Sequence, residues 1–197
     1  MYRKGQKNEF YTRKAHEEGY PARSVYKLKE IDEKFKVVAP GDKVLDLGSA
    51  PGSWLIYLSE KVGKTGKVVG LDLEDVKIEK KPNVVFYQKD ILALTSEDMQ
   101  EIGAPFDAVV ADLAPKTSGV PSIDAGKSLE LNEMAFDIAK KSLRKGGTFL
   151  TKIFESEDTK EFTENIKKHF KEVRRIKPQA VIKQSREFYI LAKGFHE

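Results

Sequence analysis

The stretch from residue 46 to residue 54 decides the fold, and it reads Asp-Leu-Gly-Ser-Ala-Pro-Gly-Ser-Trp. The residues just before it form an apolar run of strand length, and the stretch itself is rich in small residues. Pro51 suits the first position of a helix, where its missing N–H costs nothing. The glycines let a ligand approach the backbone, and the N-terminus of a helix attracts a carboxylate. The sequence therefore predicts a strand, a turn and a helix that together bind a cofactor.

This turn differs from the common nucleotide-binding loops. Ala50 stands where the dinucleotide fingerprint G-x-G-x-x-G has its second glycine, which is the residue that admits a pyrophosphate. The stretch also lacks the lysine of a Walker motif. A cofactor with an amino acid moiety and an adenosine, but without a pyrophosphate, fits the turn better.

Apolar runs of strand length alternate with helical segments over the rest of the chain. Strands are expected at residues 43–48, 67–73, 83–90, 106–114, 147–154, 171–178 and 186–193. Helices are expected from residue 51 and near residues 96–102, 124–144 and 157–169. Near-continuous Val, Ile and Leu runs are typical of buried parallel strands, so we predict a Rossmann-like α/β fold with a mostly parallel seven-stranded sheet and helices on both faces. No helix separates the last two strands, which should form a hairpin that makes the final strand antiparallel.

Length and composition predict a single globular domain over residues 1–197. The chain is 40% hydrophobic and 34% charged, which allows a core beneath a charged surface. It has no cysteine, and its three histidines are scattered, so we expect no disulfide, no thiol nucleophile and no metal site. The sequence also contains no apolar signal segment or bilayer-spanning run, and we expect a cytoplasmic monomer with no membrane partner.

The positive charge is concentrated in residues 1–36, which we call the N-terminal arm and expect to be helical. The arm holds 10 Lys and Arg against 6 Asp and Glu, whereas the catalytic core expected at residues 37–197 holds 25 of each. The arm also carries the aromatic residues Tyr2, Phe10, Tyr11, Tyr20 and Tyr26. Cations interleaved with aromatic rings favour contact with RNA phosphates and bases. On charge alone, a solvated pair of amphipathic helices is an equally good interpretation.

Carboxylates follow the second and third predicted strands, at the edge where open α/β sheets bind ligands. Asp72 lies about 20 residues after Gly52, where an acidic side chain can accept from both ribose hydroxyls of a nucleoside. Asp90 lies where an adenine amino group is expected, although on its own it could equally be a helix cap. Together with the turn, these residues predict a pocket for S-adenosylmethionine.

The fourth and fifth predicted strands supply a carboxylate and an ammonium group. Asp112 opens the sequence Asp-Leu-Ala-Pro, which differs from the polar residue, two prolines and aromatic residue used by enzymes that methylate exocyclic amines, so a base amine is not the expected target. Lys152 interrupts an apolar run, and a buried ammonium needs a partner. Asp112 is expected on the neighbouring strand. A lysine that reaches out to the sheet edge is the alternative.

Five ordered motifs resemble those of the FtsJ-like family of RNA ribose 2′-O-methyltransferases, between about Arg23 and Tyr189. They are Arg-Ser-x-Tyr-Lys-Leu at 23–28, Asp-Leu-Gly-x-Ala-Pro-Gly-x-Trp at 46–54, Asp-Leu-Ala-Pro at 112–115, Thr-Lys-Ile-Phe at 151–154 and Ser-Arg-Glu-x-Tyr at 185–189. Ser53 departs from the family, which commonly has a second glycine there, but a small residue should fit.

The resemblance implies the family's methyltransferase fold and two sets of site residues. The catalytic tetrad is then Lys27, Asp112, Lys152 and Glu187. The cofactor S-adenosylmethionine is then lined by Gly52, Trp54, Asp72, Asp90 and Asp112. Taken alone, Lys27 could lie on one face of a charged helix, and Glu187 could point outward from an edge strand.

The resemblance also implies a reaction in which a ribose 2′-oxygen attacks the methyl group in line. Lys152 would take or steer the hydroxyl proton, and Glu187 would hold Lys27. The implied partner is RNA, closest to a uridine of ribosomal RNA within the large ribosomal subunit. Because no RNA-binding module follows the last motif, we expect the arm to dock the RNA. Transfer RNA and an mRNA cap remain alternative substrates. A base or small-molecule methyltransferase and a catalytically idle RNA-binding protein remain alternative classes.

Overall fold

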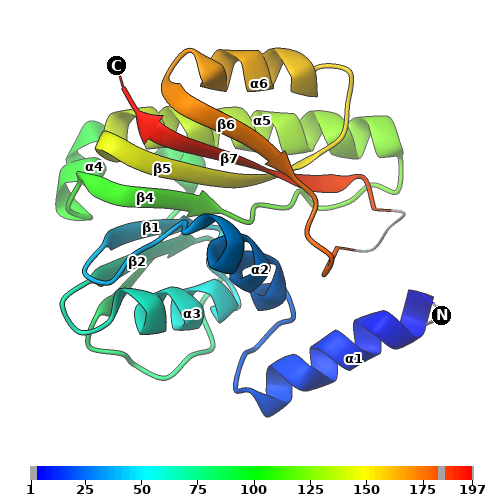
Figure 1. The fold of residues 1–197 in the computed structure, drawn as a ribbon, viewed down its shortest axis with the longest axis horizontal. Coiled ribbons are helices and arrows are strands. Elements are labelled where there is room, and N and C mark those ends of the chain that lie inside the picture. Colours follow the sequence, from blue (N-terminus) through cyan, green and yellow to red (C-terminus); the bar gives the residue numbers. More distant parts are fainter. Residues whose placement is uncertain (1–3, 182–184, 197) are drawn as a thin grey trace.

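The computed structural model describes residues 4–181 and 185–196, which form a single sheet with helices on both faces (Figure 1). Seven strands of these residues pair in the order β3-β2-β1-β4-β5-β7-β6. The strands are β1 Lys43–Leu47, β2 Lys67–Asp72, β3 Val84–Gln88, β4 Phe106–Ala111, β5 Leu143–Phe154, β6 Phe170–Ile176 and β7 Glu187–Phe195. Neighbouring strands from β3 to β5 run parallel, and β7 is antiparallel to both β5 and β6. The predicted α/β fold with a reversed final strand is therefore confirmed.

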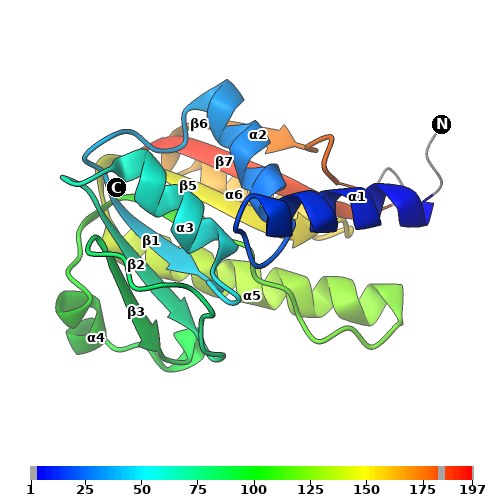
Figure 2. The same ribbon diagram turned by 90° about the horizontal axis from the view of Figure 1, so that it is seen from below.

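The helices divide between the two faces of the sheet (Figures 1 and 2). They are α1 Lys4–Glu17, α2 Val25–Phe35, α3 Ser53–Val62, α4 Ser96–Glu101, α5 Pro121–Ser142 and α6 Thr159–Lys167, with a short 3-10 turn η1 at Ile91–Ala93. Side chains of α2 and α3 share one buried apolar cluster, and side chains of α4, α5 and α6 share the other. Along β1, Val44 belongs to the first cluster and Leu45 to the second, because successive side chains of a strand point to opposite faces.

The two described helices of the N-terminal arm differ in how firmly they are held. Val25, Leu28 and Ile31 of α2 are buried in the same cluster as α3. From α1, Ala15 is buried, and the remaining described part of the helix projects past the carboxyl ends of the parallel strands (Figures 1 and 2). The start of α5 lies at that same end of the molecule. Tyr2 lies outside the described residues.

The boundaries of α3, α5 and β5 differ from those expected in ways that bear on the turn and on the glycine pair. The helix expected from Pro51 begins at Ser53 instead, since Gly52 precedes it with a φ of 111° in the left-handed region. The helix expected at 124–144 begins at Pro121 and ends at Ser142. β5 then begins at Leu143, so the Gly146-Gly147 pair lies inside the strand, not before it.

The glycine pair explains the early start of β5. Gly146 has a φ of 83°, and the register with β4 shifts between Phe106 and Ala108. A Cβ on Gly147 would lie 2.9 Å from the carbonyl oxygen of Arg144 and 3.2 Å from that of Asp107. These residues therefore allow an irregularity in the ladder where larger residues would end it.

Candidate active site

A buried ion pair lies where β4 and β5 end. Nζ of Lys152 is 2.9 Å from Oδ1 of Asp112, and it also donates to the carbonyl oxygen of Asp112 at 3.1 Å. The two side chains are 6% and 13% exposed. Ala111 of β4 and Thr151 of β5 are paired in register. The next residue of each chain segment, Asp112 and Lys152, therefore lies at the same edge of the sheet. Asp112 is thus the partner that a buried Lys152 requires, and the ammonium points to this carboxylate inside the protein.

A second ion pair joins α2 to the start of β7. Nζ of Lys27 lies 2.5 Å from Oε1 of Glu187, and both side chains are largely buried. Burial alone would raise the pKa of Asp112, but the ammonium groups of Lys152 and Lys27 outweigh it and hold that pKa below its ordinary value. The four residues predicted as a tetrad, which come from four separate elements, are therefore gathered at one place.

Tyr189 connects the two pairs, and the sequence did not single it out as a site residue. It is fully buried, and its hydroxyl donates to Oδ1 of Asp112 at 3.1 Å. Burial raises its pKa far above the ordinary value, and the carboxylates of Asp112 and Glu187 add to this rise, so the phenol stays a neutral donor. The available signal was its spacing: Tyr189 follows Glu187 by two positions in a strand, which puts both on one face.

A pocket of about 430 Å³ opens beside the tetrad, at the carboxyl ends of β1 to β4. Asp72, Asp90 and Asp112 line it, together with Gly48 and Ala50 of the turn. Asp72 accepts from the backbone N–H of Ala50, and Asp90 accepts from that of Leu92 at the start of η1. The cap foreseen for Asp90 is therefore present. Each carboxylate has about four lone-pair sites, so such a bond does not prevent a contact with a ligand.

Gly52 and Trp54 lie outside the residues that line this pocket. A Cβ on Gly52 would stand 2.3 Å from Cγ2 of Ile78, so this glycine admits the chain that passes over the turn. Trp54 is 3% exposed, stacks on Tyr189 with ring centroids 6.3 Å apart, and donates through Nε1 to the carbonyl oxygen of Ser24. Their contact with a cofactor stays a prediction.

The hydrogen-bond acceptors of the pocket fit an adenosyl cofactor. Carboxylates line the space and can accept hydrogen bonds from the hydroxyl and amino groups of an adenosyl ligand. Leu73 and Leu92, which also line the pocket, are 63% and 55% exposed. Exposed apolar side chains beside acceptors suit a planar, polar-edged ring. Gly48 has a φ of 79°, and a Cβ there would lie 2.7 Å from the side chain of Leu113, so the turn keeps the backbone close to the pocket.

Comparison with known proteins identifies the family. The model of the FtsJ-like methyltransferase family matches residues 20–195. The chain belongs to this family. The resemblance carried by the five motifs is thereby confirmed, and the matched region contains the whole tetrad and the pocket.

Two relatives and one solved structure illustrate the likeness of this FtsJ-like methyltransferase to known proteins. "Ribosomal RNA large subunit methyltransferase E" of Desulfatibacillum aliphaticivorans is 48% identical, over 92% of this chain and 87% of its own length. The protein of the same name from Bdellovibrio bacteriovorus is 45% identical, over 92% and 93%. A crystal structure of a ribosomal RNA methyltransferase from Plasmodium falciparum superposes with a TM-score of 0.78 at 28% identity, over 89% and 98%.

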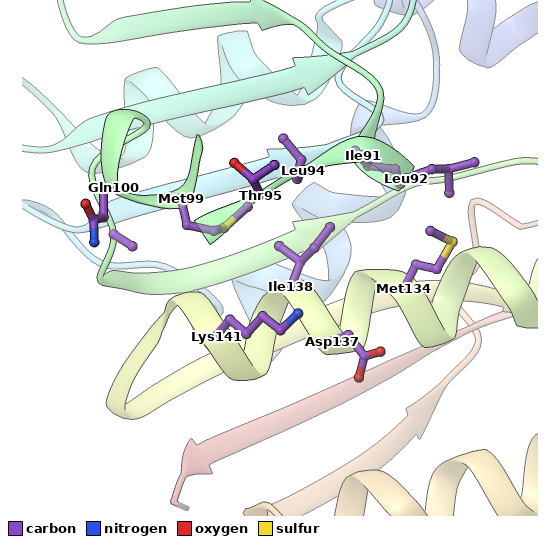
Figure 3. A pocket seen from close by; sticks show the side chains of 11 residues that line it. Ile91, Leu92, Leu94, Thr95, Met99, Gln100, Met134, Asp137, Ile138 and Lys141 are labelled. Atoms are coloured by element: carbon purple, nitrogen blue, oxygen red, sulfur yellow. The ribbon is translucent and has the colours of Figure 1, made fainter. Parts of the chain in front are cut away.

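A larger pocket of the FtsJ-like methyltransferase, of about 640 Å³, lies between η1, α4 and α5 (Figure 3). Ile91 and Leu92 line both pockets, so η1 forms the wall between them. The larger pocket is lined by mostly apolar side chains, and none of the predicted site residues is among them. Its size therefore does not mark it as the catalytic site.

Within residues 4–181 and 185–196, no group of three or more His, Cys, Asp or Glu side chains is placed to hold a metal ion. In the same part of the FtsJ-like methyltransferase, no helix is both long and apolar enough to span a membrane.

Proposed function

We propose that the chain transfers a methyl group from S-adenosylmethionine to the 2′-hydroxyl of a ribose in RNA, specifically of a uridine in large-subunit ribosomal RNA within the large ribosomal subunit. The observation that carries the proposal is the buried Lys152–Asp112 pair at the rim of the acidic pocket, with Lys27 and Glu187 beside it. Membership of the FtsJ-like family and the names of the relatives support the choice of substrate. A cytoplasmic, monomeric protein is part of the proposal.

The cofactor residues have separate roles in this proposal. S-adenosylmethionine, when bound, supplies an electrophilic methyl group on a sulfonium. Asp72 would accept hydrogen bonds from the ribose hydroxyls, and Asp90 would accept one from the adenine amino group. Gly52 and Trp54 would support the turn from behind, since neither lines the pocket. The protein thus contributes binding and alignment, and the cofactor contributes the reactive group.

Lys152 is placed to bind the attacking oxygen. An ammonium has three N–H groups, and two bonds of Lys152 go to the carboxylate and the carbonyl of Asp112. The third N–H is available for a ribose hydroxyl, where it would orient the oxygen and stabilise developing negative charge. In its neutral form the same nitrogen would accept the hydroxyl proton. Both roles require that the contacts with Asp112 hold the Lys152 side chain in its present position.

The other tetrad members hold Lys152 in position and balance its charge. Asp112 receives hydrogen bonds from Lys152 and from the hydroxyl of Tyr189, so its carboxylate is fixed on two sides. Glu187 pairs with Lys27, so the ammonium of Lys27 is not left without a counter-ion beside Lys152. The tetrad is therefore two coupled ion pairs that together present one cation to the substrate.

The N-terminal arm is the proposed docking surface for RNA. Arg13 of α1 has a side chain that is 72% exposed, and Phe10 is 46% exposed on the same helix. Tyr20 and Tyr26 are buried, however, and pack against the ammonium of Lys29, so these two rings are not available to stack on bases. The arm would then act mainly through cations that contact phosphates.

Methyl transfer to defined RNAs tests the proposal. Labelled S-adenosylmethionine is supplied with large ribosomal subunits, free ribosomal RNA, transfer RNA or capped mRNA, and the modified nucleoside is mapped. We expect 2′-O-methyluridine in large-subunit ribosomal RNA. Label on a base, or on transfer RNA or the cap in preference to ribosomal RNA, would contradict the proposed substrate. No transfer to any RNA would favour the catalytically idle alternative.

A further inference from the structure

Asp46 of β1 is a buried carboxyl group that the proposed mechanism does not use. Its exposed fraction is 0%, and neither carboxyl oxygen has a hydrogen-bond partner among the described residues. Most buried polar groups in proteins are hydrogen-bonded, because an unpaired one costs free energy and an unpaired buried charge costs much more. A carboxyl group kept here without a partner therefore calls for a functional explanation.

The position of Asp46 puts it directly beneath the cofactor turn. In register it lies between Gly70 of β2 and Val110 of β4, two residues before Gly48. The hydroxyl of Ser49 donates to the carbonyl oxygen of Asp46 at 2.8 Å, and it occupies the space above Gly70, where a Cβ would lie 2.7 Å from Oγ. Gly48 lines the pocket, so only the turn separates Asp46 from a ligand bound there.

Two further carboxyl groups approach Asp46, one from each neighbouring strand. These are Asp72 at the end of β2 and Asp112 just after β4. Burial raises the pKa of Asp46 well above its ordinary value, and the negative charges of Asp112 and Asp72 raise it further, whereas the hydroxyl of Ser49 acts weakly in the opposite direction. Burial without a hydrogen-bond partner and two neighbouring carboxyl groups thus both favour the neutral form of this side chain.

Two cations and one phenol on this face of the sheet are engaged elsewhere. Lys152 of β5 pairs with Asp112, and Lys27 of α2 pairs with Glu187. α3 packs over β1 and β2, and its phenol Tyr57 donates to Asp32. Since the ammonium groups of Lys152 and Lys27 have other partners, a cationic ligand in the pocket can supply the positive charge that would stabilise ionised Asp46.

We propose that Asp46 is a specificity-determining residue that makes the pocket favour the sulfonium cofactor over its neutral demethylated product. This inference rests on the proposed function. The positive charge of a bound sulfonium would stabilise ionised Asp46: the O–H bond would break with its electron pair kept on the oxygen, the proton would pass to the solvent, and the carboxylate would stay as a counter-ion. S-adenosylhomocysteine has a neutral thioether and leaves Asp46 protonated. After methyl transfer Asp46 recovers a proton, which loosens the product and aids its exchange.

Calorimetry of ligand binding measures this proton directly. The full chain is titrated with S-adenosylmethionine and with S-adenosylhomocysteine at neutral pH, in two buffers that differ in ionisation enthalpy. We expect the sulfonium ligand to release more protons than the thioether ligand, by up to about one per site. Equal proton release by the two ligands overturns the proposal. This comparison needs no variant.

Asp46→Asn replaces the carboxyl group with a neutral side chain of the same size. We expect its affinity for S-adenosylmethionine to fall roughly tenfold, the equivalent of one pKa unit, with the affinity for S-adenosylhomocysteine kept and the difference in proton release lost. Asp107→Asn is the matched control, because Asp107 is a carboxylate of β4 that bonds to the backbone at the start of β1, away from the pocket. An equal loss for both ligands would mean a structural role and overturn the proposal. Failure of the wild type to bind either ligand refutes the proposed cofactor itself, and this inference with it.

Discussion

Replacing Lys152 by alanine should separate catalysis from stability. The substitution removes an ammonium that is 2.9 Å from Asp112 and leaves a carboxylate that is only 13% exposed. Breaking one partner of a buried ion pair costs about 3–5 kcal/mol. Because Asp112 keeps the hydroxyl of Tyr189 as a donor, we expect a loss near the lower end, about 3 kcal/mol. Loss of the group that binds the attacking oxygen should lower the rate of methyl transfer roughly a thousandfold or more.

The double variant Lys152→Ala/Asp112→Asn is the matched control. It removes the uncompensated carboxylate as well, so it should regain most of the unfolding free energy while remaining inactive. Denaturant unfolding measures the first quantity, and methyl transfer to large-subunit RNA measures the second. Lys152→Arg should also be inactive, since a planar guanidinium replaces a compact ammonium and does not give up its proton. Near-normal turnover by folded Lys152→Ala, with the product mapped as 2′-O-methylated, would refute the assigned role of Lys152.

Three further outcomes follow from the site. Asp72→Ala should weaken S-adenosylmethionine binding by about 1–3 kcal/mol, and unchanged affinity in calorimetry would remove Asp72 from the pocket. Arg13→Gln on the exposed face of α1 should weaken RNA binding and reduce its salt dependence by about one counterion, with cofactor affinity kept; an identical salt slope would favour the solvated helix. The lowered pKa of Asp112 stabilises the fold above its unfolded pKa, and this contribution is lost as pH falls through the lower folded value. Unfolding free energy should therefore fall below about pH 4 more steeply in the wild type than in Asp112→Asn, as denaturant titrations at several pH values would measure.

The fold and one half of the tetrad could be predicted from local pattern. Strand length, apolar runs and a small-residue turn gave the order of elements, and neighbouring parallel strands bring residues just past their ends to one edge, which placed Asp112 near Lys152. The early start of β5 was missed because Gly146 and Gly147 look like a break, although here they let the strand continue through an irregular register.

The rest of the site depended on contacts between segments that are distant in sequence. Lys27 and Glu187 are 160 residues apart, and only the family resemblance suggested that they meet. Tyr189 lies in an apolar strand, so the sequence alone suggests an ordinary core residue. Asp46 comes just before a turn, so the sequence alone suggests an ordinary polar turn residue. The burial of Tyr20 and Tyr26 was also unpredictable, because an aromatic residue in a charged helix can face either side. Which side chains pair, how many hydrogen-bond partners each has and how exposed each is are determined only when the helices pack on the sheet.

The reversed direction of β7 has a consequence for biosynthesis. The residues that line the pocket lie at or before residue 116, apart from Leu131 of α5. Glu187 and Tyr189 are translated much later, and only an antiparallel strand starts at the edge where the parallel strands end. A chain that ends before β7 thus contains the residues that line the pocket but lacks Glu187 and Tyr189. If the tetrad acts as proposed, we expect unfinished chains on the ribosome to be inactive toward the RNA around them, so that activity begins only when nearly all of the protein has been synthesised.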